Sequence, residues 1–203
     1  MQKLRNPLFP KRIIIALAML LSAILLSLLS RFLRPDVPSN PPVQSEINQG
    51  QVKRVIDGDT LDVVVMNSTL RVRLRGIDAP EKDQPWGDQS VQMLKSYLPE
   101  NLTVCLRLYG QDRYGRELAE LLVDRPIPAS VSMMPCSASV NRLMVLNGGA
   151  WVYRYKGKAV DSDLLSLEDN ARSHKRGLWT ESEPVPPWQW RVQHQIVDPK
   201  ILK

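Results

Sequence analysis

The chain has 203 residues, of which 43% are hydrophobic, and a formal net charge of +6. This length supports one hydrophobic core and is short for two independent domains, so we expect one folded unit with attached segments. Residues 1–34 hold six basic and no acidic residues, which leaves 21 basic and 21 acidic residues in the remainder. The composition therefore excludes a uniformly basic domain, and any polyanion site must depend on a local group of arginines.

The N-terminal region predicts a membrane segment. Residues 1–12 are basic, and the run over 13–29 carries no charge. This run is near the lower limit of about 17 residues for a spanning helix and exceeds the roughly 7 to 15 residues of a cleavable signal's apolar core. We expect a transmembrane helix or uncleaved signal anchor over 13–30, and secretion after signal cleavage is the alternative. The basic flanks favour a cytoplasmic N-terminus, with the bulk of the chain outside the cytoplasm.

Residues 31–50 are rich in proline and polar side chains and lack an apolar period, which predicts an extended linker. A folded domain is expected over 51–180 and a C-terminal tail over 181–203. At the start of the domain, apolar residues alternate in three consecutive runs with turn signals between them, which predicts antiparallel strands. The expected strands of the whole domain cover residues 52–56, 60–66, 70–77, 102–108 and 116–123.

Helical spacing of apolar residues predicts three helices in the same domain, over 86–98, 139–146 and 162–175. Residues 124–137 contain three prolines and are expected to form a surface excursion without structure of its own. Residues 151–155 are expected to form a short strand or a bend. Five strands mixed with helices predict a small closed barrel with helices packed at its side.

Three clusters of polar residues are candidates for chemistry. They are VIDGDT (55–60), RLRGIDAPE (73–81) and DRYGR (112–116). Each cluster alone has a structural explanation as a turn or a loop. Together they supply carboxylates and arginines, which a hard metal ion and a phosphate require. Neither His174 nor His194 has a partner at zinc-like spacing, and a nucleophilic serine motif is absent, which argues against zinc and serine chemistry.

The two cysteines of the chain are Cys105 and Cys136. An exported domain would permit them to form a disulfide. The alternative is one buried thiol on a strand and one thiol in a loop. The sequence leaves both open.

In this order and on this strand pattern, the three clusters closely resemble the thermonuclease or staphylococcal nuclease family. The resemblance spans about residues 51–179 and extends to shorter motifs. These are Val140-Asn141, Gly149-Ala150-Trp151, Arg176-Gly177-Leu178-Trp179 and, as in many bacterial members, the tail sequence PPWQWR. The resemblance implies an α+β, mainly β, fold: a five-stranded OB-fold barrel with three packed helices and an active site on the barrel face.

The same resemblance assigns roles to individual residues. Asp59 and Asp78 match the family's calcium carboxylates, and Asp57 is expected to act through water. A backbone carbonyl ligand falls on Ala79, where the archetype has threonine. Glu81 matches the proposed general base toward the attacking water. The remaining matches are the phosphate-clamping arginines Arg73 and Arg116 and the substrate-binding residues Arg113, Tyr114, Tyr153 and Tyr155.

These assignments imply a membrane-anchored, calcium-dependent nuclease that hydrolyses phosphodiester bonds of DNA, with RNA as a second candidate substrate. Sequence preference is expected to be weak because phosphate and sugar dominate such contacts. The expected partners are nucleic acid and, through the N-terminal helix, a membrane, and the chain is expected to be a monomer. The alternative is a non-catalytic OB-fold module that binds nucleic acid or protein. Residues 82–86 lead quickly into a helix where the archetype has a longer lysine-containing loop, so we expect a different grip on substrate.

Overall fold

The computed structural model describes residues 47–126 and 133–194. The expected membrane segment at 13–30 lies outside these residues and stays a prediction. Within the two described ranges, no helix is both long enough and apolar enough to cross a membrane.

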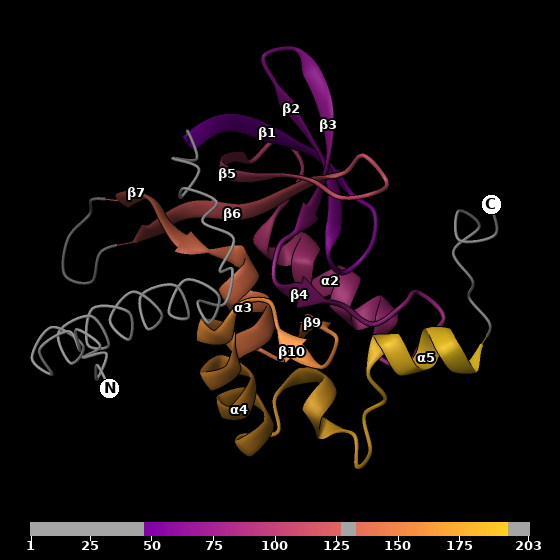
Figure 1. Ribbon diagram of the computed structural model, residues 1–203. Coiled ribbons are helices and arrows are strands. Elements are labelled where there is room, and N and C mark those ends of the chain that lie inside the picture. Colours follow the sequence, from indigo (N-terminus) through magenta and orange to yellow (C-terminus); the bar gives the residue numbers. More distant parts are fainter. Residues whose placement is uncertain (1–46, 127–132, 195–203) are drawn as a thin grey trace, which may run out of the picture. The chain divides into compact units, whose positions relative to one another are not determined.

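A six-stranded sheet forms the main part of the domain (Figure 1), with the strand order β3-β2-β1-β5-β6-β7. Neighbouring strands are antiparallel, and β3 also pairs with β6 in parallel. This last pairing closes β1, β2, β3, β5 and β6 into a barrel, which confirms the predicted five-stranded barrel. The bounds are β1 Ile47–Val55, β2 Thr60–Val65, β3 Ser68–Leu74, β5 Thr103–Gln111, β6 Glu117–Pro126 and β7 Met133–Ser139.

The first strand begins earlier than its apolar pattern indicates. β1 starts at Ile47, so the last residues of the expected linker over 31–50 belong to the barrel. Asn48 pairs with Leu106 of β5, and Gly50 pairs with Val104. Backbone hydrogen bonds make this pairing, and they do not require the apolar alternation by which strands are predicted.

Alternating apolar positions fill the barrel interior. Val72 and Leu74 of β3 are fully buried, as are Ala119 and Leu121 of β6. Arg73 lies between the two buried positions of β3, so the strand directs its side chain to the opposite face. This alternation explains why a charged residue stands inside an otherwise apolar strand.

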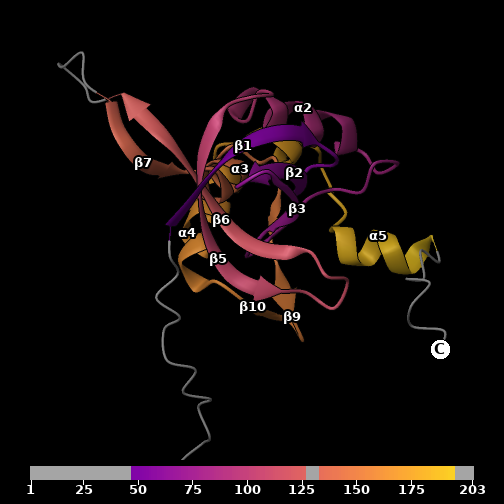
Figure 2. The same ribbon diagram turned by 90° about the horizontal axis from the view of Figure 1, so that it is seen from above.

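The prediction that residues 124–137 have no structure of their own is wrong for 124–126 and 133–137, while residues 127–132 lie outside the described residues. β6 continues to Pro126, β7 begins at Met133, and the two strands pair antiparallel beyond the barrel (Figures 1 and 2). The pairing shifts register between Val123 and Arg125, which marks a bulge. Prolines are tolerated because β7 is at the edge of the sheet, where a missing N–H breaks no ladder on the outer side.

The helices lie together below the barrel in the view of Figure 1, except α5, which lies to one side. α2, α3 and the pair η1 and α4 confirm the three predicted helices, and α5 is an additional helix within the predicted tail. Short strands β4 and β8 pair with each other, as do β9 and β10. The bounds are β4 Ile77–Asp78, α2 Gly87–Tyr97, α3 Val140–Leu146, β8 Trp151–Val152, β9 Arg154–Tyr155, β10 Lys158–Ala159, η1 Ser162–Leu164, α4 Leu165–Ser173, η2 Gly177–Thr180 and α5 Pro187–Gln193.

Asn141, near the start of α3, ties this helix to the barrel. Its side-chain oxygen accepts from the N–H of Leu121 at 3.0 Å. Its amide nitrogen donates to the carbonyl of Arg75 at 2.9 Å and to that of Ala119 at 3.1 Å. Because these backbone groups are buried, a side chain that satisfies all three fixes the helix against the strands β3 and β6.

The two cysteines form a disulfide. Cys105 of β5 is bonded to Cys136 of β7, with the two Cα atoms 5.8 Å apart. In the sheet, β6 separates these strands. The bond therefore fixes β7 to the barrel across the intervening strand, and it decides the alternatives that the sequence left open.

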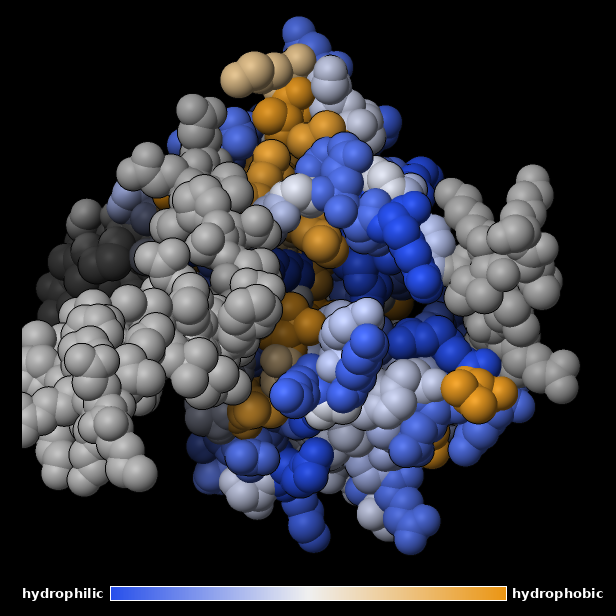
Figure 3. All heavy atoms as spheres, viewed as in Figure 1, coloured by the Kyte–Doolittle hydropathy of each residue, from blue (hydrophilic) through white to orange (hydrophobic). Residues whose placement is uncertain are grey.

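The surface seen in Figure 3 is mostly hydrophilic, with hydrophobic spheres gathered toward the tip of the β2–β3 hairpin at the top of the view. Met66, in the turn of this hairpin, is 89% exposed. Its backbone φ of 45° and that of Asn67, 64°, are those of a tight two-residue hairpin turn. Single exposed hydrophobic residues of this kind are ordinary on a soluble surface.

Candidate active site

The turn Asp57-Gly58-Asp59 joins β1 to β2 and holds two of the predicted metal-site carboxylates. Asp57 accepts a hydrogen bond on Oδ1 from the backbone N–H of Asp59 at 3.0 Å. Asp59 is buried, with 3% of its surface exposed. A Cβ atom on Gly58 would lie 2.1 Å from Oγ of Ser90, so glycine is needed for the turn to pack against α2. The turn geometry thus keeps both carboxylates in fixed positions.

A second segment brings Asp78 to this turn. Asp78 lies in β4 opposite Trp151 of β8 and is 1% exposed. The next residue, Ala79, donates its backbone N–H to Oδ2 of Asp59 at 3.1 Å. Asp59, Asp78 and Ala79, which we predicted as ligands of one ion, are therefore brought together.

Arg73 joins the two buried carboxylates. Its Nη1 donates to Oδ1 of Asp59 at 2.6 Å, and its Nη2 donates to Oδ1 of Asp78 at 2.9 Å. Burial opposes the charge on Arg73, but the nearby carboxylates outweigh this effect and raise the pKa of its guanidinium. The side chain therefore stays charged and lies at the centre of the predicted site.

Glu81, the predicted general base, lies in a compact turn that leads into α2. Its N–H donates to the side-chain oxygen of Gln84 at 3.1 Å, and its carbonyl accepts from the N–H of Gln84 at 3.0 Å. A Cβ atom on Gly87 would lie 2.2 Å from the carbonyl oxygen of Glu81, so this close packing also requires glycine. The Glu81 side chain is about one third exposed, which leaves the carboxylate accessible to water.

Arg191 of α5 is a site residue that the sequence analysis did not identify. Its Nη1 donates to Oε1 of Glu81 at 2.6 Å, and its Nη2 donates to Oδ2 of Asp78 at 2.8 Å. It belongs to the tail motif PPWQWR, whose resemblance we noted without assigning a role. The sequence offers no local signal for this contact, because Arg191 and Glu81 are 110 residues apart.

Arg116, the second predicted phosphate clamp, has a different partner. Its Nε donates to Oδ2 of Asp112 at 2.7 Å. It directly precedes β6, whose first residue, Glu117, pairs with Val72 of β3, the neighbour of Arg73. The backbone of Arg116 is therefore placed beside β3, while Asp59 and Asp78 form their ion pairs with Arg73 and Arg191.

Tyr114 lies close to two arginines of the same loop. The guanidinium of Arg113 is 4.8 Å from its ring centroid and that of Arg116 is 5.4 Å away. The loop is shaped by Asp112, which accepts from the N–H groups of Tyr114 and Arg116. The predicted substrate residues Arg113 and Tyr114 therefore form one cationic and aromatic surface with the predicted phosphate clamp Arg116, which is suited to phosphate and base contacts.

The remaining predicted substrate residues lie after β8. Tyr153 is half-buried, and its N–H donates to the carbonyl of Gly76 at 2.9 Å, beside β4. Tyr155 of β9 is 60% exposed, with Nζ of Lys156 5.5 Å from its ring centroid. Their role toward substrate stays a prediction.

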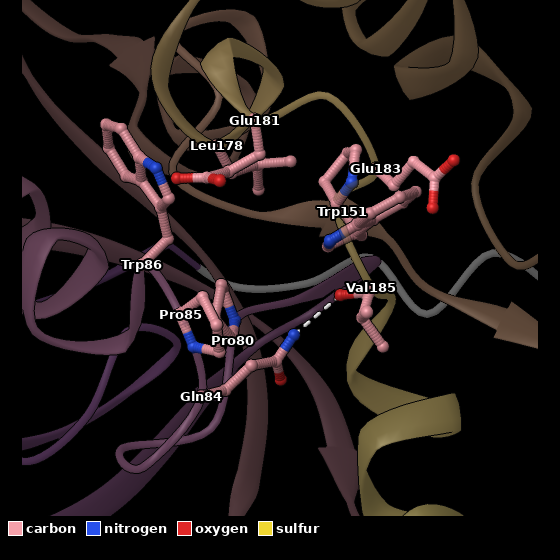
Figure 4. A pocket seen from close by; sticks show the side chains of 10 residues that line it. Pro80, Gln84, Pro85, Trp86, Trp151, Leu178, Glu181, Glu183 and Val185 are labelled. Atoms are coloured by element: carbon pink, nitrogen blue, oxygen red, sulfur yellow. Dashed lines mark hydrogen bonds between the residues drawn. The ribbon is translucent and has the colours of Figure 1, made fainter.

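A hollow is lined in part by Pro80 and Gln84, which flank Glu81 in the sequence (Figure 4). Trp86 and Trp151 line it, together with the segment that precedes α5. In Figure 4, Gln84 points toward Val185, and its Nε2 donates to the Val185 carbonyl at 2.6 Å. This contact connects the turn that carries Glu81 to the chain that leads to Arg191.

The acidic side chains outnumber the basic ones at the site. Burial, followed by the charge of Asp59, raises the pKa of Asp57 from 3.8 to about 6. The acidic side chains are those of Asp57, Asp59, Asp78 and Glu81, and the basic ones are those of Arg73 and Arg191. The excess is two acidic side chains.

The donor set is compatible with a hard divalent cation. In residues 47–126 and 133–194, no group of three or more histidine, cysteine, aspartate or glutamate side chains is close enough to hold a metal ion by itself. The side chains that meet here at Arg73 are the carboxylates of Asp59 and Asp78, whose donor atoms are oxygen, the element that calcium prefers. The excess of two acidic side chains over basic ones also suits one divalent ion, so the residues present fit such a group.

Comparisons with known proteins agree with this geometry. The sequence profile described as "Staphylococcal nuclease homologue" matches residues 71–181. The chain is 41% identical over 150 residues to Protein ParB of Escherichia coli, covering 74% of this chain and 82% of that protein. It is 38% identical over 143 residues to the micrococcal nuclease of Shigella flexneri, covering 70% and 80%. An uncharacterized endonuclease of Escherichia coli O157:H7 is 41% identical over 150 residues, covering 74% and 89%. With more than half of its length matched and relatives aligned over most of theirs, the chain belongs to the staphylococcal nuclease homologue family.

Proposed function

We propose that this chain is a calcium-dependent nuclease that cleaves DNA, with RNA as a second substrate, and that it works from a membrane anchor outside the cytoplasm. Membership of a nuclease family makes the chain a hydrolase of phosphodiester bonds. The observation that carries the proposal is the convergence of buried Asp59 and Asp78 on Arg73, beside an accessible Glu81. Sequence preference is expected to be weak, because phosphate contacts carry no base information.

The proposed division of labour follows from the residues. Asp59, Asp78 and the Ala79 carbonyl would hold the cation, which when bound supplies charge neutralisation at the phosphate. Glu81 has a carboxylate open to water, so it orients the attacking water and accepts its proton. Arg73 offers N–H donors to the phosphate oxygens, whose negative charge increases in the transition state.

The test of the metal uses the full-length chain, purified in a mild detergent and incubated with DNA or RNA in calcium or in chelator. Cleavage in calcium and none in chelator is the expected result. Cleavage that persists in chelator would contradict calcium dependence. Binding without cleavage in every condition would favour a non-catalytic OB-fold module.

The test of Glu81 is the substitution Glu81→Gln, which keeps size and removes the base. We expect turnover to fall by about 10²- to 10⁴-fold, the contribution typical of general acid–base catalysis. The matched control is Glu120→Gln, because Glu120 forms an ion pair with Arg107 on neighbouring strands of the barrel. Full activity in Glu81→Gln would remove Glu81 from the mechanism.

The membrane part of the proposal rests on the apolar run over 13–29 and is supported by the disulfide between Cys105 and Cys136, which forms readily in oxidising compartments. Protease treatment of intact cells and of inverted membrane vesicles tests it. The domain is expected to be digested in its native location outside the cytoplasm and protected inside inverted vesicles. Recovery of the whole chain in the soluble fraction would contradict the anchor.

A further inference from the structure

Arg191 touches both carboxylates on which the proposed reaction depends. Its two terminal nitrogens approach the two oxygens of Asp78 at 2.8 and 3.3 Å, and Nη1 also contacts Glu81 at 2.6 Å. A planar guanidinium can make these contacts together because its donors form a rigid fork. One side chain therefore sets the separation of Asp78 and Glu81.

Helix α5, which carries Arg191, is docked by contacts that do not involve its charge. Trp188 packs edge-on against Trp151, with ring centroids 5.7 Å apart. The guanidinium of Arg154 lies 5.6 Å from the Trp188 ring, and Pro187 is buried at the first turn. The backbone at Arg191 is therefore already held in place by the packing of α5. Less conformational entropy is lost when the Arg191 side chain forms its ion pairs.

Gln84 joins the Glu81 turn to the segment before α5. Its side-chain oxygen accepts from the N–H of Glu81, while its side-chain nitrogen donates to the Val185 carbonyl. Gln84 is 6% exposed, so both hydrogen bonds are shielded from water. Backbone and side chain of Glu81 are thus both held by the C-terminal segment.

We propose that Arg191 is a positioning residue of the nuclease reaction, which acts by holding the Glu81 carboxylate in a fixed orientation beside Asp78. This inference rests on the proposed function of Glu81. Without Arg191, the two carboxylates repel each other and the Glu81 side chain, which is about one third exposed, gains other rotamers. A misplacement of about 1 Å can reduce turnover about 10²-fold.

A positioning role predicts that removal of Arg191 changes calcium affinity and catalytic rate in opposite directions. Arg191 places a positive charge on Asp78, so its removal should strengthen calcium binding. Its removal should also weaken catalysis, because Glu81 is no longer held. If removal of Arg191 merely damaged the site, calcium binding and catalysis would both weaken. If α5 merely blocked the site, removal of Arg191 would strengthen both calcium binding and catalysis.

The experiment compares the full-length wild type with Arg191→Ala, Arg191→Lys and the control Arg107→Ala. Arg107 forms a 2.6 Å ion pair with Glu120 and is similarly exposed, at 37% against 32% for Arg191. For Arg191→Ala we expect kcat to fall about 10²-fold with KM changed less than about threefold. Calcium affinity, from titration calorimetry, should rise several-fold. Arg191→Lys should keep wild-type calcium affinity and lose about tenfold in kcat, because an amine cannot bridge both carboxylates as a fork does.

A readout independent of cleavage is amide hydrogen exchange in calcium-free protein. The N–H of Gln84 is hydrogen-bonded to the Glu81 carbonyl. Its exchange should be faster than in the wild type in Arg191→Ala and equal to the wild type in Arg107→Ala. Unchanged or raised kcat, weaker calcium binding, or unchanged exchange in Arg191→Ala would overturn the inference. A wild-type chain that cleaves neither nucleic acid would instead overturn the proposed function, so the two failures are distinguishable.

Discussion

Arg73 donates from Nη1 to Oδ1 of Asp59 at 2.6 Å, and only 18% of its side chain and 5% of that of Asp59 are exposed. The same guanidinium also pairs with Asp78 through Nη2. Arg73 thus pairs with both buried carboxylates, while Asp78 has a second arginine partner in Arg191. Arg73 is therefore expected to affect folding as well as catalysis.

Replacing Arg73 by glutamine should destabilise the metal-free protein by about 3 kcal/mol, because it leaves the buried carboxylate of Asp59 without its arginine partner. Calcium should restore part of this loss by supplying positive charge at the same carboxylates. Urea unfolding in chelator and in calcium measures both effects. Arg107→Gln, which breaks an ion pair with a larger exposed fraction, should cost less than about 1 kcal/mol. Equal losses in the two variants would contradict the role assigned to Arg73 in the fold.

The substitution Arg116→Ala should lower the rate of cleavage and leave the stability of the fold almost unchanged. Its pair with Asp112 lies in a loop and is partly exposed, so the free energy of unfolding should change by less than about 1 kcal/mol. If Arg116 contacts the phosphate in the transition state, kcat should fall about 10²- to 10³-fold. The measurement is steady-state cleavage of DNA in calcium. Arg54→Ala, which removes another arginine paired with an aspartate, is the control and should retain activity. An Arg116→Ala variant as active as this control would remove Arg116 from the site.

Asp57 predicts a pH dependence of stability in the calcium-free protein. Its pKa is raised in the fold from 3.8 to about 6, so the folded state binds this proton more tightly than the unfolded state. The stabilisation is complete below about pH 4 and is lost as the pH rises through about 6. Asp57→Asn should therefore be more stable than wild type at pH 7 by on the order of 1 kcal/mol, with the difference vanishing at pH 4.

Chemical unfolding of both proteins between pH 4 and pH 7 measures this difference. Added calcium should reduce it, because a nearby cation favours the ionised carboxylate. A difference that is constant with pH would show that the proton on Asp57 does not contribute.

The disulfide predicts a loss of stability on reduction. Cys105 and Cys136 are 31 residues apart, so opening this loop should cost about 3 kcal/mol, chiefly through the entropy of the unfolded chain. Thermal unfolding with and without a reductant measures the effect. A Cys105→Ser, Cys136→Ser double variant should resemble the reduced wild type and show no response to the reductant. A wild type insensitive to reduction would contradict a stabilising role for the bond.

Much of the barrel could be predicted because its strands alternate in hydrophobicity over short stretches. Val72 and Leu74 flank Arg73 in such a pattern, and both are buried as the alternation requires. β7 was not predicted, because Pro135 and its polar residues obscure the strand signal. Its place depends on backbone pairing with β6 and on a disulfide, which are contacts between distant residues.

The candidate site likewise contains residues that could be predicted from the sequence and one that could not. Asp59, Asp78 and Glu81 belong to short motifs, whose order along the chain suffices to predict that they act together. Arg191 belongs to a tail without any local pattern that connects it to them.

The sequence by itself determined the barrel strands and the family resemblance, because local periodicity and motif order encode them, and that resemblance predicts the carboxylates of the site. The tertiary structure alone decided that Cys105 pairs with Cys136 and that Arg191 lies between Asp78 and Glu81. The physical reason is that such contacts join residues far apart in the chain. They depend on how the barrel closes and on how Trp188 packs against Trp151, and no local sequence pattern predicts either.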